Sequence, residues 1–431
     1  MVNAPHVNSY YAATARDSLG FARLEQELEA DVAIIGGGFT GISTGIELAE
    51  RGLDVVVLEA NKVGWGATGR NGGQVTGSLS GEGSMHRLFA SSLGQQEAKD
   101  YVWNLKWRGH SIIERRAEKY GIDCDLRYGH IQTAIAPKHL RELEAVYSEA
   151  KRRGMADQCT LLDEVQVKQY IGSDLYIGGL LNKRNMHLHS LDLCVGEARA
   201  LESIGGRVFE SSGVLKIEHG ALARVITLAG CVKARTVIVA GNAFHTLEAK
   251  ATQGALFPAS LSNMATEVLP KGLVDELNPH NMAVYDSRFV LDYFRMTADN
   301  RLMFGSGTNY SGQQDKDIVA ALRPAMLRVF PQLESVAIEY AWAGIDGIIA
   351  NRIPQVGYIQ PNVLFAQGYS GHGIALTHIM GEILAKAVTG DTQEFDLFES
   401  VPHIKLPYAR TFGSQIQAAG MAFYKLKDAL F

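Results

Sequence analysis

The stretch ADVAIIGGGFTGISTGIELAERGLDVVVLEA, residues 30–60, decides the fold. Its first apolar run, DVAIIG at 31–36, is typical of a strand that is buried on both faces, as in a parallel sheet. Residues 40–51 then carry apolar side chains at helical spacing, and Gly52 ends the predicted helix. The run DVVVLE at 54–59 predicts a second buried strand. Together these segments predict one βαβ unit.

A glycine fingerprint lies between the first strand and the helix, where Gly36, Gly38 and Gly41 form GxGxxG. The first glycine allows a tight turn, the second lets the backbone approach a pyrophosphate, and the third lets the helix pack on the strand. The helix N-terminus adds free N–H groups for the phosphates. Glu59 ends the second strand, where an acid accepts ribose hydroxyls and repels the extra phosphate of NADP. We therefore predict a dinucleotide site that also includes Phe39, Thr40 and Ala60.

A second glycine cluster, GWGATGRNGGQV at 64–75, favours FAD over NAD as the bound dinucleotide. Residues 64–83 are too rich in glycine for a regular element, and the alternative to a binding role is a mobile surface loop. Bare backbone with one arginine and one asparagine suits a segment that lies along a pyrophosphate, a ribityl chain and a flavin edge. The segment TVIVAGNAF at 236–244 is a weaker sign of the far side of the cofactor. The residues predicted to bind FAD here are Gly66, Ala67, Thr68, Arg70, Asn71, Gly72, Gly73, Gln74, Val214, Ala240, Gly241 and Asn242.

The segment QGYSGHG at 367–373 comes directly before a predicted helix at 374–388. When a flavin accepts a hydride at N5, negative charge develops around N1 and O2, and backbone N–H groups at a helix N-terminus can stabilise it. The alternative is a strand-to-helix turn without a chemical role. We predict that Tyr369, His372 and Arg352 act in catalysis, and that the cofactor contacts in this segment are Gly368, Ser370, Gly371, His372 and Gly373.

Four further residues are candidates for the substrate side of the flavin. Arg352 precedes Ile353-Pro354 and can clamp a carboxylate through two bonds; the alternative is a structural ion pair. Tyr293 and Arg295 alternate with apolar neighbours in VLDYFRM, so both should face the substrate pocket, or else both face solvent. Trp342 is either a wall of this pocket or a core residue.

Composition limits the classes of protein. The chain has 431 residues, which suits two intertwined domains, and its net charge of −5 gives no sign of a nucleic-acid partner. No apolar run approaches the roughly 18 residues of a membrane span, and the N-terminus lacks the apolar segment of a signal peptide, so we expect a cytoplasmic protein without an integral membrane segment. His187 and His189 lie on one side of a strand-like HLH, but no cysteine or acid completes a ligand set, so no metal is expected. The sequence has four widely spaced cysteines, expected as free thiols: Cys124, Cys159, Cys194 and Cys231.

These motifs together resemble the glycine-oxidase and sarcosine-oxidase clan of FAD amine oxidases, and within it the bacterial γ-glutamylputrescine oxidases. The FAD motifs, with HLHSLDL (187–193) and QGYSGHGIALTHIMGEILA (367–385), carry the likeness to the clan. SYYAA (9–13) and VLDYFRMTADNRLMFGSG (290–307) carry the likeness to the narrower family. The carrying segments run over nearly the whole chain.

The resemblance implies an α/β fold: a Rossmann-like FAD domain with a parallel sheet, and a second α+β substrate domain whose antiparallel sheet covers the flavin. Alternating stretches at 282–295 and 300–305 favour the antiparallel sheet, and helical patterns occur at 95–121, at 138–153 and, weakly, at 414–428. The predicted division is FAD-binding parts at 28–85, 188–250 and 343–392, substrate parts at 86–187 and 251–342, and a C-terminal tail at 393–431.

The resemblance also implies a reaction. A small-molecule amine, most of all γ-glutamylputrescine or a similar polyamine derivative, is oxidised to an aldehyde with release of ammonia and hydrogen peroxide. Relatives with covalent flavin carry a cysteine just upstream of the segment that matches RIPQVG (352–357), and since no cysteine follows Cys231 here, we expect FAD bound non-covalently. The departure GIDGIIANR (344–352) leaves the specificity open. The alternatives are a dehydrogenase of a secondary or D-amino acid that passes electrons to a carrier, and a flavin-binding scaffold without turnover.

The electron acceptor, molecular oxygen or a carrier, depends on one further position. In sarcosine-oxidase-like relatives a lysine over the flavin activates oxygen, because a fixed positive charge stabilises superoxide. The matching strand here, RLMFGSG, has Met303 at that position, which predicts a slower reaction with oxygen. The alternative is that Met303 only fills the inner face of the strand.

Overall fold

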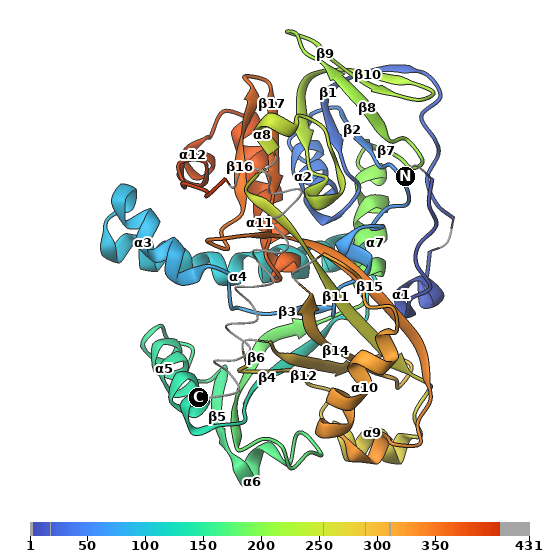
Figure 1. Cartoon of the computed structure of the whole chain (residues 1–431). Coiled ribbons are helices and arrows are strands. Elements are labelled where there is room, and N and C mark those ends of the chain that lie inside the picture. Colours follow the sequence, from blue (N-terminus) through green and yellow to red (C-terminus); the bar gives the residue numbers. More distant parts are fainter. Residues whose placement is uncertain (1–2, 18, 253, 289, 310–311, 406–431) are drawn as a thin grey trace.

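Two β-sheets, each covered by its own helices, form the core of the computed structural model (Figure 1). The structure describes residues 3–405 apart from 18, 253, 289 and 310–311. The first sheet contains β1 (Glu27–Ile35), β2 (Val55–Leu58), β7 (Arg207–Phe209), β8 (Val214–Glu218), β9 (Ala223–Thr227), β10 (Cys231–Val239), β16 (Gln355–Gln360) and β17 (Val363–Gln367). The second contains β3 (Gln74–Val75), β4 (Arg127–Ala134), β5 (Cys159–Asp163), β6 (Gly178–His187), β11 (Leu256–Thr266), β12 (Ala283–Asp286), β13 (Asp292–Met296), β14 (Leu302–Asn309) and β15 (Ile338–Ile349).

The first sheet is parallel at its centre. Strand β1 lies between β10 and β2, and both pairings are parallel, with Ile34 opposite Ile238 on one side and Val57 on the other. Strands β17 and β7 extend the parallel part, whereas β16 and β9 pair antiparallel. The predicted βαβ unit and the parallel sheet are confirmed.

Helices cover one face of this sheet, and a β-hairpin covers part of the other. The helical layer consists of α2 (Phe39–Ala49), α4 (Gln95–Tyr120), α7 (Ser190–Ser203) and α11 (Gly373–Val388). Ile34 and Val57 pack under this layer, while Ala33 and Val56 face β8 and β9, because successive side chains of a strand point to opposite faces. None of the described helices is long and apolar enough to cross a bilayer.

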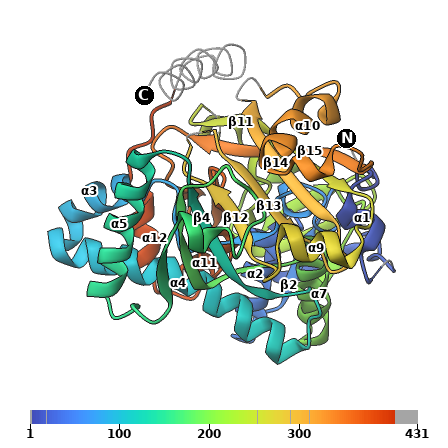
Figure 2. The ribbon, with the colours of Figure 1, turned by 90° about the horizontal axis from the view of Figure 1, so that it is seen from below.

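The second sheet is mostly antiparallel; β12 and β4 form its parallel pair (Figure 2). Helices α9 (Lys271–Leu277) and α10 (Ile318–Val329) lie against it. Phe294 and Phe304 pack with Phe330 into the core on that side. The alternate residues of β13, Tyr293 and Arg295, therefore point to the other face, toward the first sheet. The predicted antiparallel sheet is confirmed.

The remaining helices are short connectors apart from two longer surface helices. They are α1 (Tyr10–Thr14), α3 (Glu82–Leu93), α5 (Pro137–Arg152), α6 (Glu164–Val167), α8 (Ala249–Thr252) and α12 (Gln393–Glu399), with 3₁₀ turns at Ala67–Gly69, Asn242–Phe244 and Pro331–Leu333. The segment 64–83 is therefore less irregular than predicted, since it holds a 3₁₀ turn, strand β3 and the start of α3.

The predicted domain ranges stay a prediction, and several elements cross them; β15 of the second sheet, for example, spans the predicted boundary at 342/343. Strand β3 falls in a predicted FAD range but pairs with β6 of the second sheet. Helix α4 falls in a predicted substrate range but packs against α11 in the helical layer of the first sheet. The helix expected at 414–428 lies outside the described residues.

Candidate active site

A cavity of about 860 Å³ lies between the two sheets. The first sheet contributes the carboxyl ends of its parallel strands, among them Ile35, Leu58 and Ala240. The second contributes residues of β11, β12, β13 and β15, such as Tyr285 and Tyr293. In open parallel sheets, ligands bind at the carboxyl ends of the strands, so this cavity is the candidate active site.

The glycine fingerprint forms the turn between β1 and α2. Gly36 has a φ of +118°, and a Cβ atom there would lie 2.8 Å from the carbonyl oxygen of Ala240. A Cβ atom at Gly41 would lie 1.9 Å from the carbonyl oxygen of Gly36, which explains the close approach of helix to strand. Gly36 and Gly38 line the cavity, whereas Gly41 packs behind them. The sequence predicts that Gly41 contacts the cofactor, but in the structure Gly41 packs the helix against the strand and does not line the cavity.

Glu59 lies at the end of β2 and lines the cavity together with Ala60 and Val214. Its carboxylate accepts the N–H of Gly37 at 2.7 Å and the N–H of Asn61 at 2.8 Å. Burial raises the pKa of the Glu59 carboxyl group. These bonds hold the acid beside the glycine turn, where the sequence predicts it to meet a ribose.

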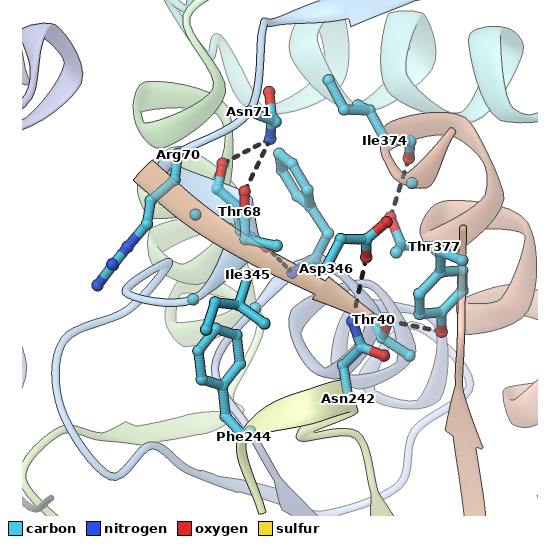
Figure 3. A pocket seen from close by; sticks show the side chains of 18 of the residues that line it. Thr40, Thr68, Arg70, Asn71, Asn242, Phe244, Ile345, Asp346, Ile374 and Thr377 are labelled. Atoms are coloured by element: carbon cyan, nitrogen blue, oxygen red, sulfur yellow. Dashed lines mark hydrogen bonds between the residues drawn. The ribbon is translucent and has the colours of Figure 1, made fainter. Parts of the chain in front are cut away.

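The segment 66–74 is an ordered wall of the cavity (Figure 3). The amide of Asn71 donates to the carbonyl groups of Ala67 and Thr68, at 3.2 and 2.8 Å, and the hydroxyl of Thr68 accepts the N–H of Phe39 at 3.2 Å. Arg70 donates from Nε and Nη1 to backbone carbonyl groups, while its buried Nη2 has no partner among the described residues. The cavity thus offers a glycine cradle and a spare donor, and both fit a bound dinucleotide.

The segment 367–373 is hydrogen-bonded to residues on several other parts of the cavity wall. The hydroxyl of Thr40, in the first turn of α2, donates to the hydroxyl of Tyr369 at 2.7 Å. Gly368 does not line the cavity; its N–H donates to Asn242 at 2.9 Å. The N–H of Gly371 is taken by the Asp346 carboxylate at 2.6 Å. The first turn of α11 has no side-chain cap and lines the cavity at Gly373, Ile374 and Ala375, so the stabilisation of negative charge by this turn stays a prediction.

His372 is a neutral residue whose ring nitrogens are both hydrogen-bonded. The hydroxyl of Ser80 donates to the carbonyl group of Ser370 at 2.7 Å, so it must accept from Nδ1–H of His372 at 2.8 Å. Nε2 then accepts from the hydroxyl of Ser78 at 3.1 Å. Burial, together with the charge of Arg352, lowers the pKa of His372 to about 4. His372 therefore carries no positive charge at neutral pH.

Arg352 and Asp346 bring opposite charges to the cavity wall. Arg352 has a φ of +62°, and its Nη1 lies 3.5 Å from the carbonyl oxygen of Ser370. Burial raises the pKa of Asp346. The hydrogen bonds from Gly371 and Asn242 and the charge of Arg352 lower this pKa, but burial outweighs them. Figure 3 shows Asp346 and Asn242 facing each other across their bond.

Tyr293 takes its predicted place on the cavity wall. Its ring lies so close to Gly72 and Gly305 that a Cβ atom on either would come within 2.6 and 2.2 Å of the ring. Its hydroxyl donates to Asn263 at 3.0 Å, and burial raises its pKa. The two glycines are therefore required by the tyrosine ring between them.

Two predicted substrate residues lie outside the cavity. Arg295 shares the face of Tyr293, but its buried guanidinium donates to the carbonyl group of Gly72 at 3.0 Å, behind the wall. Trp342 donates from its indole to the carbonyl group of Arg70 at 3.0 Å and is a core residue. Met303 is buried in the same cluster, so the packing alternative describes it. For Arg295 and Trp342, a backbone segment of the wall separates the side chain from the cavity.

Several residues on or behind the wall were not predicted. Tyr285 lies on β12, and its ring centroid lies 4.5 Å from that of His130, with the two rings tilted at 44° to each other. Ser80 is also on the wall, while Ser78, hydrogen-bonded to Tyr285 and His372, lies just behind it. The sequence holds a signal for Asp346 alone, an acid inside the apolar, glycine-flanked run GIDGII. The serines carry no pattern of their own, because their role depends on contacts about 290 residues apart in the sequence.

A nucleotide-binding sheet, a cavity at its carboxyl ends and an antiparallel sheet over that cavity define a flavin-dependent oxidoreductase. The family model described as FAD dependent oxidoreductase matches residues 31–387, and the chain belongs to this family. FAD is therefore its cofactor, and the clan inferred from the motifs is confirmed.

Known oxidoreductases and oxidases are similar to this chain in sequence or in fold. The chain is 40% identical to γ-glutamylputrescine oxidoreductase of Escherichia coli over 99% of both chains, and 37% identical to a probable oxidoreductase of Haemophilus influenzae over 98% of this chain and 97% of that one. Among solved structures, glycine oxidase of Geobacillus kaustophilus superimposes with a TM-score of 0.70 at 21% identity, over 87% of this chain and 100% of that one. The latter likeness shows the fold.

Proposed function

We propose that this chain oxidises the primary amine of a γ-glutamylated or similar polyamine derivative to an aldehyde, with release of ammonia and hydrogen peroxide. The observation that carries the proposal is a single cavity that joins the glycine turn at 36–38 to Tyr293, Arg352 and His372. Support also comes from the whole-chain likeness to γ-glutamylputrescine oxidoreductase.

Bound FAD supplies the acceptor for a hydride from the α-carbon of the amine. The hydride leaves only when the nitrogen lone pair is free, because this lone pair stabilises the iminium that forms. Water then adds to the iminium and ammonia leaves. Oxygen takes two electrons and two protons to become hydrogen peroxide.

His372 is a poor candidate for the base that takes the substrate proton. The Nε2 atom of His372 accepts from Ser78, and the pKa of about 4 makes the ring a weak acceptor of an ammonium proton. We therefore assign the proton of the substrate ammonium to water. His372, Ser78 and Ser80 fix the shape and polarity of this part of the wall.

Arg352 is our candidate for the carboxylate of the γ-glutamyl group. Of the described residues, Arg70 and Arg352 are the arginines that line the cavity; Arg70 donates from two nitrogens to the wall, and Nη1 of Arg352 lies 3.5 Å from the carbonyl oxygen of Ser370. The guanidinium fork of Arg352 matches a carboxylate in geometry and charge. Arg352→Met should raise KM for γ-glutamylputrescine at least tenfold and that for putrescine less than threefold, with Arg352→Lys between. Equal changes for both amines would remove Arg352 from this role.

A panel of amines under anaerobic conditions tests the proposal as a whole. γ-Glutamylputrescine should bleach the flavin fastest, ahead of putrescine, sarcosine, proline and D-alanine, and aerobic turnover should yield equal amounts of ammonia and hydrogen peroxide. The second candidate is an amino-acid dehydrogenase that passes electrons to a carrier. It predicts bleaching by an amino acid and turnover with a dye but little peroxide. No bleaching by any amine would leave only a scaffold.

A further inference from the structure

Among the described residues, two arginines are almost completely buried, and they differ in their partners. Arg116 and Arg295 are each 1% exposed. Arg116 lies 2.9 Å from Glu47 and 3.1 Å from Glu197. No ion pair within 4.0 Å joins Arg295 to a carboxylate in the part of the chain that the structure describes. Burial of a charge without a counter-charge costs free energy, so a purely structural role does not explain why Arg295 is buried here.

The hydrogen bonds of Arg295 go to neutral acceptors. Nε donates to the carbonyl group of Gly72 at 3.0 Å, Nη1 to that of Met296 at 3.2 Å, and Nη2 to the hydroxyl of Tyr11 at 3.2 Å. These bonds fix the guanidinium, and none of the three acceptors carries a negative charge. The histidines nearby add no compensation, since burial first and Arg295 second lower the pKa of both His187 and His189 to about 3.

The fixed charge lies one peptide behind the cavity. Gly72 and Gly73 line the cavity, and a Cβ atom at Gly73 would come within 2.9 Å of Nε of Arg295. Tyr293, two residues before Arg295 on the same face of β13, touches the cavity itself. Because burial excludes water here, little screening reduces the field of Arg295 across the Gly72 peptide.

We propose that Arg295 acts through the Gly72 peptide as a positively charged positioning residue, which stabilises the negative charge that FAD acquires on reduction. Oxidised flavin that accepts one hydride gains two electrons and one proton, and it then carries one negative charge more. The inference rests on the proposed function only in that FAD is reduced in this cavity. It accounts for a charge that no carboxylate neutralises, and it replaces the substrate contact predicted for Arg295.

Sodium sulfite and the reduction potential test this role without any amine. Sulfite adds to flavin N5 and leaves negative charge on the ring, so it reports the same stabilisation. Arg295→Gln, which keeps donors for Gly72 but no charge, should weaken sulfite binding at least tenfold. The two-electron potential of the bound flavin should fall by about 30 mV for each tenfold loss. Arg295→Lys, the matched control with charge, should stay within threefold of the wild type.

An unchanged Arg295→Gln variant, or a Lys variant as weak as the Gln variant, overturns the proposal. The wild type gives a second test that needs no variant. If a fixed cation keeps the reduced flavin anionic, one proton accompanies two electrons, and the potential falls by about 30 mV per pH unit. A fall of about 59 mV per pH unit between pH 6 and 8 means a neutral reduced flavin, and also overturns the proposal. A wrong substrate assignment affects neither measurement.

Discussion

Arg116 of α4 lies 3.1 Å from Glu197 of α7, and both side chains are buried beneath α2. The carboxylate of Glu197 also accepts from His378 of α11 at 3.0 Å, and Glu47 of α2 meets Arg116 at 2.9 Å. One buried network therefore joins the four helices of the layer that supports the nucleotide turn.

Removal of the Arg116 charge should destabilise the protein strongly. Arg116→Met removes the buried cation that Glu47 and Glu197 share, and loss of one partner of a buried ion pair costs about 3–5 kcal/mol of the free energy of unfolding. The matched control is Arg115→Met, because Arg115 is 54% exposed and should cost no more than about 0.5 kcal/mol. Chemical denaturation of both variants measures the difference. Equal losses would show that the network is not a source of stability.

The same network sets a direction for the pH dependence. Burial opposes ionisation of Glu197, but His378 and Arg116 outweigh it and lower the pKa of Glu197 below its unfolded value of 4.5. A carboxyl group with a lowered folded pKa stabilises the protein above the unfolded pKa, and this stability is lost as the pH falls through the folded pKa. The wild type should therefore lose stability below about pH 4.5, and Arg116→Met should lose less over that range.

The FAD site gives a further prediction. A valine at Gly38 places its side chain in the cavity and within about 3.1 Å of the Thr68 hydroxyl, so Gly38→Val should yield colourless protein. Gly83→Ala is the matched control, because a Cβ atom at Gly83 meets nothing within 4 Å. None of the four cysteines lines the cavity, and acid precipitation of the yellow wild type should release all FAD. Flavin that stays in the precipitate would contradict non-covalent binding.

The sequence could predict the nucleotide half of this site because its signals are local. A strand, a glycine turn and a helix follow one another within 30 residues, so GxGxxG and Glu59 could be placed without knowledge of distant contacts. The glycines at 72–73 could be assigned to the cavity for the same reason.

The substrate half could be predicted only in part, because it depends on register between distant strands. Alternation along β13 placed Tyr293 and Arg295 on one face, which is what the structure shows. It could not show that Gly72 lies between Arg295 and the cavity, a contact across 223 residues of sequence. Trp342 likewise meets the backbone at Arg70, 272 residues away, and this places its ring behind the wall.

The next prediction concerns the pH dependence of the rate of flavin reduction. Only the neutral amine can lose a hydride, and a free amine has a pKa of about 10.4, so the neutral fraction rises tenfold per pH unit below that value. His372, with its pKa lowered to about 4, is unprotonated throughout and adds no second step. The rate of flavin reduction under subsaturating amine should therefore rise from pH 6 to pH 10, with an apparent pKa that follows the substrate. Stopped-flow absorbance measures it, and a flat profile, or a pKa common to amines of different basicity, would contradict the assignment to the substrate.

The last prediction concerns the oxidant. Met303 lies directly opposite Arg295 on the paired strands β13 and β14, and its sulfur accepts from the Tyr11 hydroxyl at 3.7 Å. Met303, the position expected to lack charge, therefore has the cation of Arg295 beside it. The Gly72 peptide separates this cation from the cavity. Since positive charge stabilises superoxide in the first electron transfer, oxygen should reoxidise the reduced flavin, more slowly than in lysine-bearing relatives. Arg295→Gln should slow reoxidation by oxygen at least tenfold.

A neutral dye acceptor and two variants of Met303 complete this test. Reoxidation by a neutral dye should change less than threefold in Arg295→Gln, because it passes through no superoxide, and Met303→Leu should leave both rates within threefold of the wild type. Met303→Lys would place a second buried cation opposite Arg295, so it should destabilise the fold by several kcal/mol instead of speeding the reaction with oxygen. Stopped-flow mixing of reduced enzyme with oxygen, beside thermal unfolding, distinguishes these effects. A stable Met303→Lys variant that reacts faster with oxygen would show that the methionine side chain reaches the flavin, and that the charge of Arg295 does not serve in its place.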